Sequence, residues 1–191
     1  MKTTNTRLLL ICSLLVVATA FLRVLNLEMG LFHLTPLAAI SLFTGAVIKD
    51  KSYAYMLPLG ALLISDIFLE VTSGTGFYGM SQLFVYIGMM SVAFLGTKMR
   101  SFKPLSIAGF SIAGSTLFWI ISNLGVFLGG YYGFSFTGFI QTYVMAIPFL
   151  GNEMSNTLFI NAFASDLFMS FVLFGTYAFV RKSQLSVAKA S

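Results

Sequence analysis

The chain has 191 residues, of which 58% are hydrophobic and only 9% are charged. Soluble domains usually carry about 25% charged residues, so this composition excludes an ordinary soluble protein. The net charge of +5 does not indicate nucleic-acid binding, because the cations flank apolar blocks and form no basic face. The sequence therefore predicts a single integral membrane domain over residues 1–191, with no nucleic-acid partner.

Six apolar blocks approach the roughly 20 residues that a helix needs to cross a bilayer. We expect them to form an all-α, polytopic membrane bundle of about six transmembrane helices, with both termini in the cytoplasm. In chain order, the predicted helices cover residues 8–25, 34–48, 53–69, 81–97, 105–128 and 158–180. The expected location is the inner (plasma) membrane of a cell, as a multi-pass protein surrounded by the lipid bilayer.

The Lys and Arg residues divide unequally between the two sides of this topology. Only Arg23 falls on the predicted outer side. The predicted inner side receives the ten others: Lys2, Arg7, Lys49, Lys51, Lys98, Arg100, Lys103, Arg181, Lys182 and Lys189. Because cytoplasmic loops carry an excess of Lys and Arg, this bias predicts the orientation and supports an even number of spans.

The longest connection, residues 129–157, lies on the predicted outer side and is rich in Gly and aromatic residues. Long loops in compact proteins are often functional. Within it, residues 139–150 are apolar but too few to span a bilayer. A re-entrant segment, a lid over the bundle and an aromatic belt at the outer surface all fit this pattern, and the sequence leaves the three open.

Two aspartates lie inside apolar helices, where a charge costs about 2.5–3.5 kcal/mol on insertion scales. Asp166 is eight residues into the last predicted helix, and Ser170 is one turn further along the same face. Asp66 is near the outer end of the third predicted helix, where it could also be a carboxylate at the membrane interface. Such groups need a partner, water or a function, so Asp166 and Asp66 are the first candidates for a substrate-binding site.

Uncharged polar and aromatic residues extend this candidate site. Asn123 lies in the outer third of the fifth predicted helix, with Trp119 and Thr116 below it at helical spacing. Asn161 lies near the outer start of the last helix. Together with the aspartates, these groups predict a solute pocket in the outer half of the bundle. The alternative interpretation is that a buried Asn only bonds across helices.

Arg23 and His33 complete the outer candidates. Arg23 could pair with an outer carboxylate or bind an anionic group of a ligand. His33, the only histidine, precedes a predicted helix and is either a structural residue or a proton relay. With one His and one Cys (Cys12), the sequence predicts no metal site. It also lacks the phosphate-binding Gly-x-x-x-x-Gly-Lys-Ser/Thr motif, so we expect no ATP hydrolysis by that route and no cofactor.

Several motifs resemble those of a family of small bacterial membrane proteins described only as candidate transport proteins. They are His33-Leu34-Thr35-Pro36-Leu37-Ala38-Ala39, Ser122-Asn123-Leu124-Gly125-Val126, Tyr143 with Ala146-Ile147-Pro148-Phe149, and Asn161 to Asp166-Leu167. The resemblance covers most of the chain, implies six membrane helices and adds Tyr143 to the candidate substrate-binding residues. His33 stands where that family usually has Asn, and Ser165 stands where it usually has Gly.

More distantly, six short helices with an outward pocket resemble the substrate-capture (S) components of energy-coupling-factor vitamin transporters. That resemblance implies a solute bound on the outside and a separate energising module as a partner. The alanine-spaced motif usual in the first helix of those subunits is absent here, so the partnership stays open.

These observations favour a membrane transport protein, either a substrate-capture subunit or a small carrier. The outer side carries more carboxylate than cation, so we expect a neutral or cationic small-molecule solute. Two alternatives remain open. Asp66 and Asp166 could form an intramembrane aspartyl peptidase dyad, which requires two carboxyls close enough to share one proton. A non-catalytic membrane scaffold would show no coherent pocket.

Overall fold

The computed structural model describes residues 13–14, 37–146 and 153–190, and within the last helix it describes the side chains of residues 163–182. In chain order the helices are α2 (Leu37–Val47), α3 (Lys51–Ser73), α4 (Met80–Gly96), α5 (Pro104–Leu128), α6 (Phe136–Met145) and α7 (Glu153–Ala190). This described part contains no strand, which confirms the all-α class for it. The first predicted helix, residues 8–25, lies almost entirely outside it.

Three described helical segments are long and apolar enough to cross a membrane: α3, α5 and the part of α7 from Phe163 to Lys182. The helices α2 and α4 are apolar but have only 11 and 17 residues. At 1.5 Å per residue, α2 extends about 16 Å, roughly half of a bilayer's hydrocarbon core. By length and composition, the described part therefore holds three candidate spans where five of the six predicted spans fall, and the side of the membrane on which each end lies remains a prediction.

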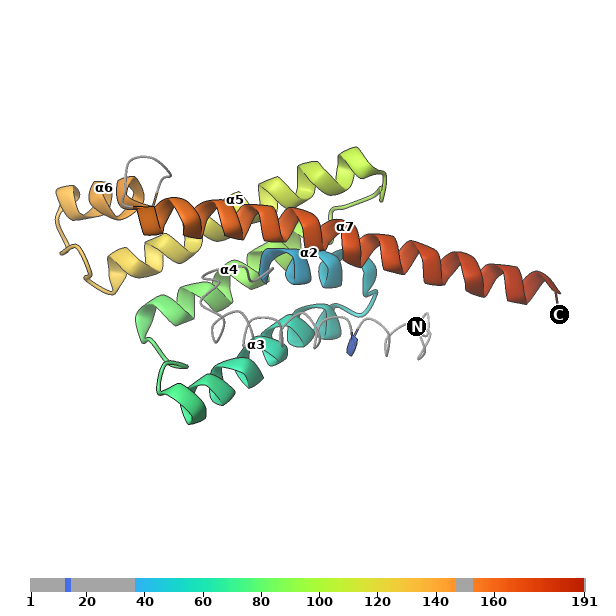
Figure 1. Ribbon diagram of the computed structural model, residues 1–191, viewed down its shortest axis with the longest axis horizontal. Coiled ribbons are helices and arrows are strands. Elements are labelled where there is room, and N and C mark those ends of the chain that lie inside the picture. Colours follow the sequence, from blue (N-terminus) through green and yellow to red (C-terminus); the bar gives the residue numbers. More distant parts are fainter. Residues whose placement is uncertain (1–12, 15–36, 147–152, 191) are drawn as a thin grey trace.

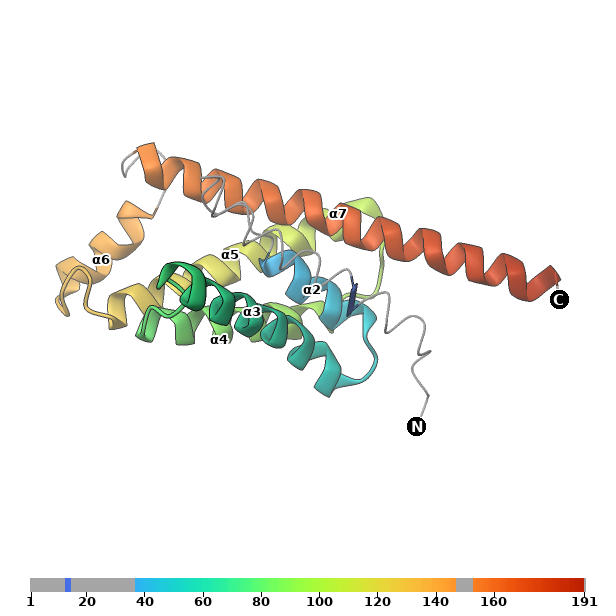
Figure 2. The same ribbon diagram turned by 60° about the horizontal axis from the view of Figure 1, so that its bottom comes forward.

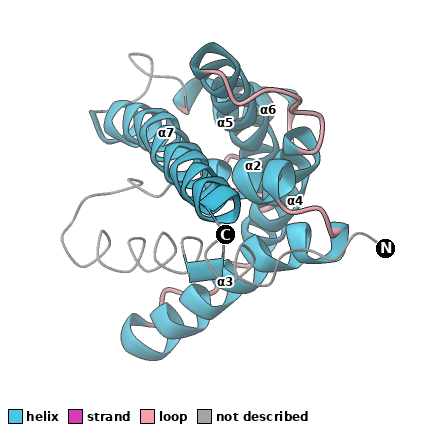
Figure 3. Cartoon of the chain, turned by 90° about the vertical axis from the view of Figure 1, so that its right-hand side faces the viewer, coloured by secondary structure: helices cyan, strands magenta, loops and turns pink. Residues whose placement is uncertain are grey.

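The short helix α2 occupies the centre of the bundle, between α7 on one side and α3 and α4 on the other (Figures 1 and 3). It contacts α3, α4, α5 and α7, and Leu42 and Phe43 are completely buried. Gly45 of α2 lies directly against the backbone of α4. A Cβ at this position would overlap the carbonyl group of Ala93. Small residues allow this close approach between membrane helices.

Local sequence signals set the ends of the other helices. The carboxylate of Asp50 caps α3 by accepting a hydrogen bond from the amide of Ser52 at 2.9 Å. The same helix ends at Gly74, whose φ of 65° favours glycine. Pro104 occupies the first turn of α5, where its missing N–H costs nothing.

Both described connections that carry basic residues lie at one end of the molecule (Figures 1 and 2). They join α2 to α3 and α4 to α5, whereas the α3–α4 and α5–α6 connections lie at the opposite end. The helix α7 runs the length of the bundle, and its C-terminal part extends beyond the other helices at the basic end. The described basic residues are Lys49, Lys51, Lys98, Arg100, Lys103, Arg181 and Lys182. Gathering them at one end is what the predicted topology requires.

Candidate functional site

Asp166 in α7 is only 3% exposed, and its carboxylate connects three helices. Oδ1 accepts a hydrogen bond from the backbone amide of Ala39 in α2 at 3.0 Å. Oδ2 accepts one from the hydroxyl of Ser115 in α5 at 2.8 Å. The face of α7 that bears Asp166 and Ser170 points into the bundle, since Ser170 is completely buried.

The bond from Ala39 shows that Asp166 caps the N-terminus of α2. A mid-helix amide would donate to the carbonyl four residues earlier, whereas the first-turn amides of a helix have no such partner. The N-terminal end of a helix also carries a partial positive charge, which a carboxylate stabilises. Asp166 therefore acts as an N-cap supplied by another helix, 127 residues away in the sequence.

A row of polar and aromatic side chains runs along α5 on either side of this contact. Ser111, Ser115, Trp119 and Asn123 follow one another at four-residue intervals, so they share one face of the helix. Ser170 in α7 donates a hydrogen bond to the hydroxyl oxygen of Ser111 at 3.1 Å, one turn from the Asp166–Ser115 bond. The two bonds define a polar seam between α5 and α7 in the interior of the bundle.

Aromatic side chains continue this row toward the C-terminal end of α5. The rings of Trp119 and Tyr143 meet edge to face, with their centroids 5.7 Å apart. The hydroxyl of Tyr143 donates to the carbonyl oxygen of Ile120 at 3.0 Å. Asn123 is half-buried above Trp119 and donates to the Trp119 carbonyl at 2.8 Å.

Asp66 belongs to a separate hydrogen-bond network between α3 and α4. Its Oδ2 accepts hydrogen bonds from the side-chain amide of Gln82 at 2.8 Å and from the hydroxyl of Tyr86 at 2.7 Å. Gln82 also donates to the carbonyl of Gly76 in the α3–α4 connection at 3.2 Å. Asp66 is completely buried, so it is not the exposed interfacial carboxylate that its position near a helix end allowed.

The structure thus brings four of the predicted site residues together and separates a fifth. Asp166, Trp119, Asn123 and Tyr143 lie along the α5 row. Asp66 bonds to Gln82 and Tyr86 in α4, whereas Asp166 bonds to Ala39 in α2 and to Ser115 in α5. Three further predicted residues cannot be compared: Arg23, His33 and the side chain of Asn161 lie outside the described residues.

Sequence reasoning missed Ser115, which donates to Asp166, and Gln82 and Tyr86, which donate to Asp66. It placed Thr116 in the α5 row, but Thr116 is exposed and donates to the carbonyl of Ile112 in its own helix. Residues three and four positions before Trp119 are both at helical spacing, so the sequence alone could not choose between Thr116 and Ser115. In the part of the chain that the structure describes, no three His, Cys, Asp or Glu residues come together as metal ligands.

Residues 2–188 match a protein family described as a family of unknown function, DUF6580. The chain belongs to this family. No curated protein and no solved structure matches it. Membership covers almost the whole chain but assigns no activity, so any function must be argued from the site itself.

Proposed function

We propose that this DUF6580 protein is a small membrane transport protein that binds a neutral or cationic solute beside the capped N-terminus of α2. It would work as a substrate-capture subunit with a separate energising partner or as a small carrier. The observation that carries the proposal is the buried N-terminus of α2, held by Asp166 in the interior of the bundle.

The depth of that helix end supports the proposal. Ser115, which shares Asp166 with α2, is near the middle of the 25 residues of α5. If α5 spans the membrane, α2 begins close to the bilayer midplane. Secondary transporters bind their solutes near the midplane at discontinuous helices, whose N-termini point at anionic groups. Here the carboxylate of Asp166 already supplies the anionic group, so the end of α2 does not itself require an anionic solute. A helix end at such depth is tolerated only inside protein or beside a water-filled cavity.

The groups beyond this helix end suit an uncharged or positively charged solute. Trp119 and Tyr143 offer aromatic surfaces, which attract cations and stack on planar groups. Asn123 offers an amide, and Asp166 offers a carboxylate. The described Lys and Arg residues belong to connections and helix ends at the basic end of the molecule, away from the α5–α6 turn (Figure 1). A multiply anionic solute would therefore meet no cation among the described groups of the site.

The proposal can be tested with the single tryptophan of the chain as a reporter. Purified protein in detergent or nanodiscs is titrated with neutral, cationic and anionic solutes while Trp119 fluorescence and thermal stability are recorded. A solute that binds in the α5 row should change both signals. Asn123→Ala should weaken its binding by about 1–3 kcal/mol, the cost of losing a buried polar partner.

Thr116→Ala is the matched control, because Thr116 is on the same helix but points away from the row. It should bind the solute like the wild type. Equal weakening by Asn123→Ala and Thr116→Ala, or solutes that stabilise the protein without changing Trp119 fluorescence, would place binding elsewhere and refute the proposed site.

The peptidase alternative requires Asp66 and Asp166 to share a proton. Each carboxylate has donors of its own, Gln82 and Tyr86 for Asp66 and Ala39 and Ser115 for Asp166. A peptidase would lose all cleavage of a membrane-embedded peptide in either Asp→Asn variant, so this alternative stays testable on the same proteins.

A further inference from the structure

The short helix α6 folds back along the C-terminal part of α5. The chain reverses through Gly130 and Gly133, whose φ angles of 77° and 79° favour glycine. The hydroxyl of Ser135 then caps α6 by accepting a hydrogen bond from the amide of Gly138 at 3.0 Å. Phe139 near the start of α6 contacts Phe127, and Tyr143 near its end contacts Ile120, seven residues earlier in α5, so the two helices form an antiparallel hairpin (Figures 1 and 2).

The contacts between α6 and α5 show how far α6 extends along α5 from the α5–α6 turn. Near its start, Phe139 packs on Phe127, with ring centroids 5.3 Å apart, next to the end of α5. One turn later, Tyr143 contacts Trp119 and bonds to the carbonyl of Ile120. Ile120 lies eight residues before the end of α5, which corresponds to about 12 Å along the helix.

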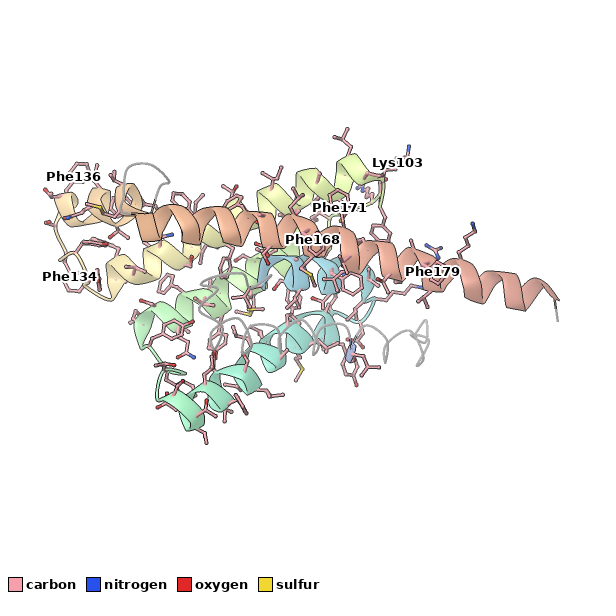
Figure 4. The ribbon with its side chains drawn as sticks, in the orientation of Figure 1. Lys103, Phe134, Phe136, Phe168, Phe171 and Phe179 are labelled. Carbon is pink, nitrogen blue, oxygen red and sulfur yellow. The ribbon has the colours of Figure 1, made fainter. Side chains whose placement is uncertain are left out.

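The composition of the hairpin suits the interior of a bilayer. From residue 104 to residue 152 the chain contains no Asp, Glu, Lys, Arg or His. Phe136 is 80% exposed and Ile140 is 46% exposed, and the two lie one turn apart on one side of α6. Thr137 and Gln141, which are also exposed, form a second row beside them. In Figure 4, Phe134 and Phe136 lie at the end of the molecule opposite Lys103.

We infer that α6 is a re-entrant helix: it enters the leaflet on the side of the α5–α6 turn, and its Phe136–Ile140 row contacts lipid acyl chains. The Thr137–Gln141 row, on a different side of α6, faces away from the lipid. Because α5 is long and apolar enough to span, a helix antiparallel to its last turns must descend into the same leaflet. The inference depends on α5 crossing the membrane and not on the identity of any solute.

Spin labels at single cysteines test this inference in nanodiscs, after Cys12→Ser removes the only native cysteine. Collisions with oxygen and with a water-soluble nickel chelate report depth for labels at Phe136 and Ile140. The label at Ile140 should lie deeper than the label at Phe136 by up to about 6 Å, one helical turn. Gln141 should show greater exposure to the nickel chelate than Ile140, its neighbour.

Labels at Ile112 and Ile120, exposed residues eight positions apart on α5, calibrate the depth scale. Circular dichroism of each labelled protein confirms that it is folded, and a label at Phe139 replaces any position that fails. Equal depth at Phe136 and Ile140 would mean an interfacial belt and would overturn the inference. High nickel accessibility at all three labelled α6 positions would mean a lid in water and would overturn it equally.

Discussion

The cap that Asp166 provides for α2 predicts an unequal effect of two substitutions at this position. In Asp166→Asn, the amide oxygen can still accept from the Ala39 amide. The new NH2 group can donate to the Ser115 hydroxyl, whose proton turns to the carbonyl of Ser111, already 3.0 Å from the Ser115 oxygen. Every group keeps a partner, although the charge is lost. In Asp166→Ala, the Ala39 amide and the Ser115 side chain both lose the carboxylate.

The magnitudes follow from those contacts. Loss of a carboxylate at a helix N-terminus costs about 0.3–1 kcal/mol, and the asparagine also avoids burying a charge, so Asp166→Asn should change stability by less than about 1 kcal/mol. Leaving a buried backbone amide unsatisfied costs about 1–3 kcal/mol. Asp166→Ala should therefore lower the free energy of unfolding by about 1–3 kcal/mol more than Asp166→Asn does.

Equilibrium unfolding in detergent, followed by circular dichroism, measures this difference, and hydrogen exchange at Ala39 localises it. The matched control is Ser170→Ala, which removes only the bond to Ser111 one turn away and should cost about 0.6 kcal/mol, the mean for side-chain hydrogen bonds between membrane helices. If Asp166→Ala were as stable as wild type and Ala39 exchanged no faster, the cap would contribute nothing. Because Asp166→Asn should stay folded, a loss of solute binding in this variant would report on the negative charge of Asp166.

The remaining predictions concern packing, the second carboxylate and topology. Gly45→Ala places a methyl group against a carbonyl of α4 and should lower the free energy of unfolding by about 1–3 kcal/mol or more. Gly109→Ala places its methyl group in open space on α5, so it should be neutral or stabilising by up to about 1 kcal/mol. Thermal unfolding compares the two variants. Tyr86→Phe removes the hydrogen bond from the Tyr86 hydroxyl to the buried carboxylate of Asp66. It should lower the free energy of unfolding by about 0.5–1.5 kcal/mol in the same assay. An impermeant maleimide added outside cells should label a cysteine at Ser73 and not one at Ser101, and the reverse result would invert the predicted orientation.

Helix positions were predictable because apolar runs in this chain are bounded by Gly, Pro and charged residues. The predicted segments 81–97 and 105–128 differ by one residue at most from the ends of α4 and α5. The last helix is longer than predicted at both ends. The prediction stopped at the first basic residue, Arg181, but a helix can continue into water after its apolar part ends.

The long-range contacts of the site could not be read from the sequence. Helical spacing correctly placed Asp166 and Ser170 on one buried face, since that pattern is local. The bond to Ala39 depends on how α7 crosses α2, and no local pattern encodes a cap supplied from 127 residues away.

The two oxygens of Asp166 differ in how easily a cationic solute could bind them. Oδ1 holds the Ala39 amide, which has no alternative acceptor in the first turn of a helix. Oδ2 holds the Ser115 hydroxyl, which can instead donate to the carbonyl of Ser111. A solute cation bound at Oδ2 would thus leave no donor unsatisfied. If the proposed function is correct, Ser115→Ala should keep or strengthen the binding of cationic solutes. Asp166→Asn should abolish that binding. Titration of the Trp119 signal measures both, and a loss in Ser115→Ala as large as that in Asn123→Ala would show that Ser115 itself contacts the solute.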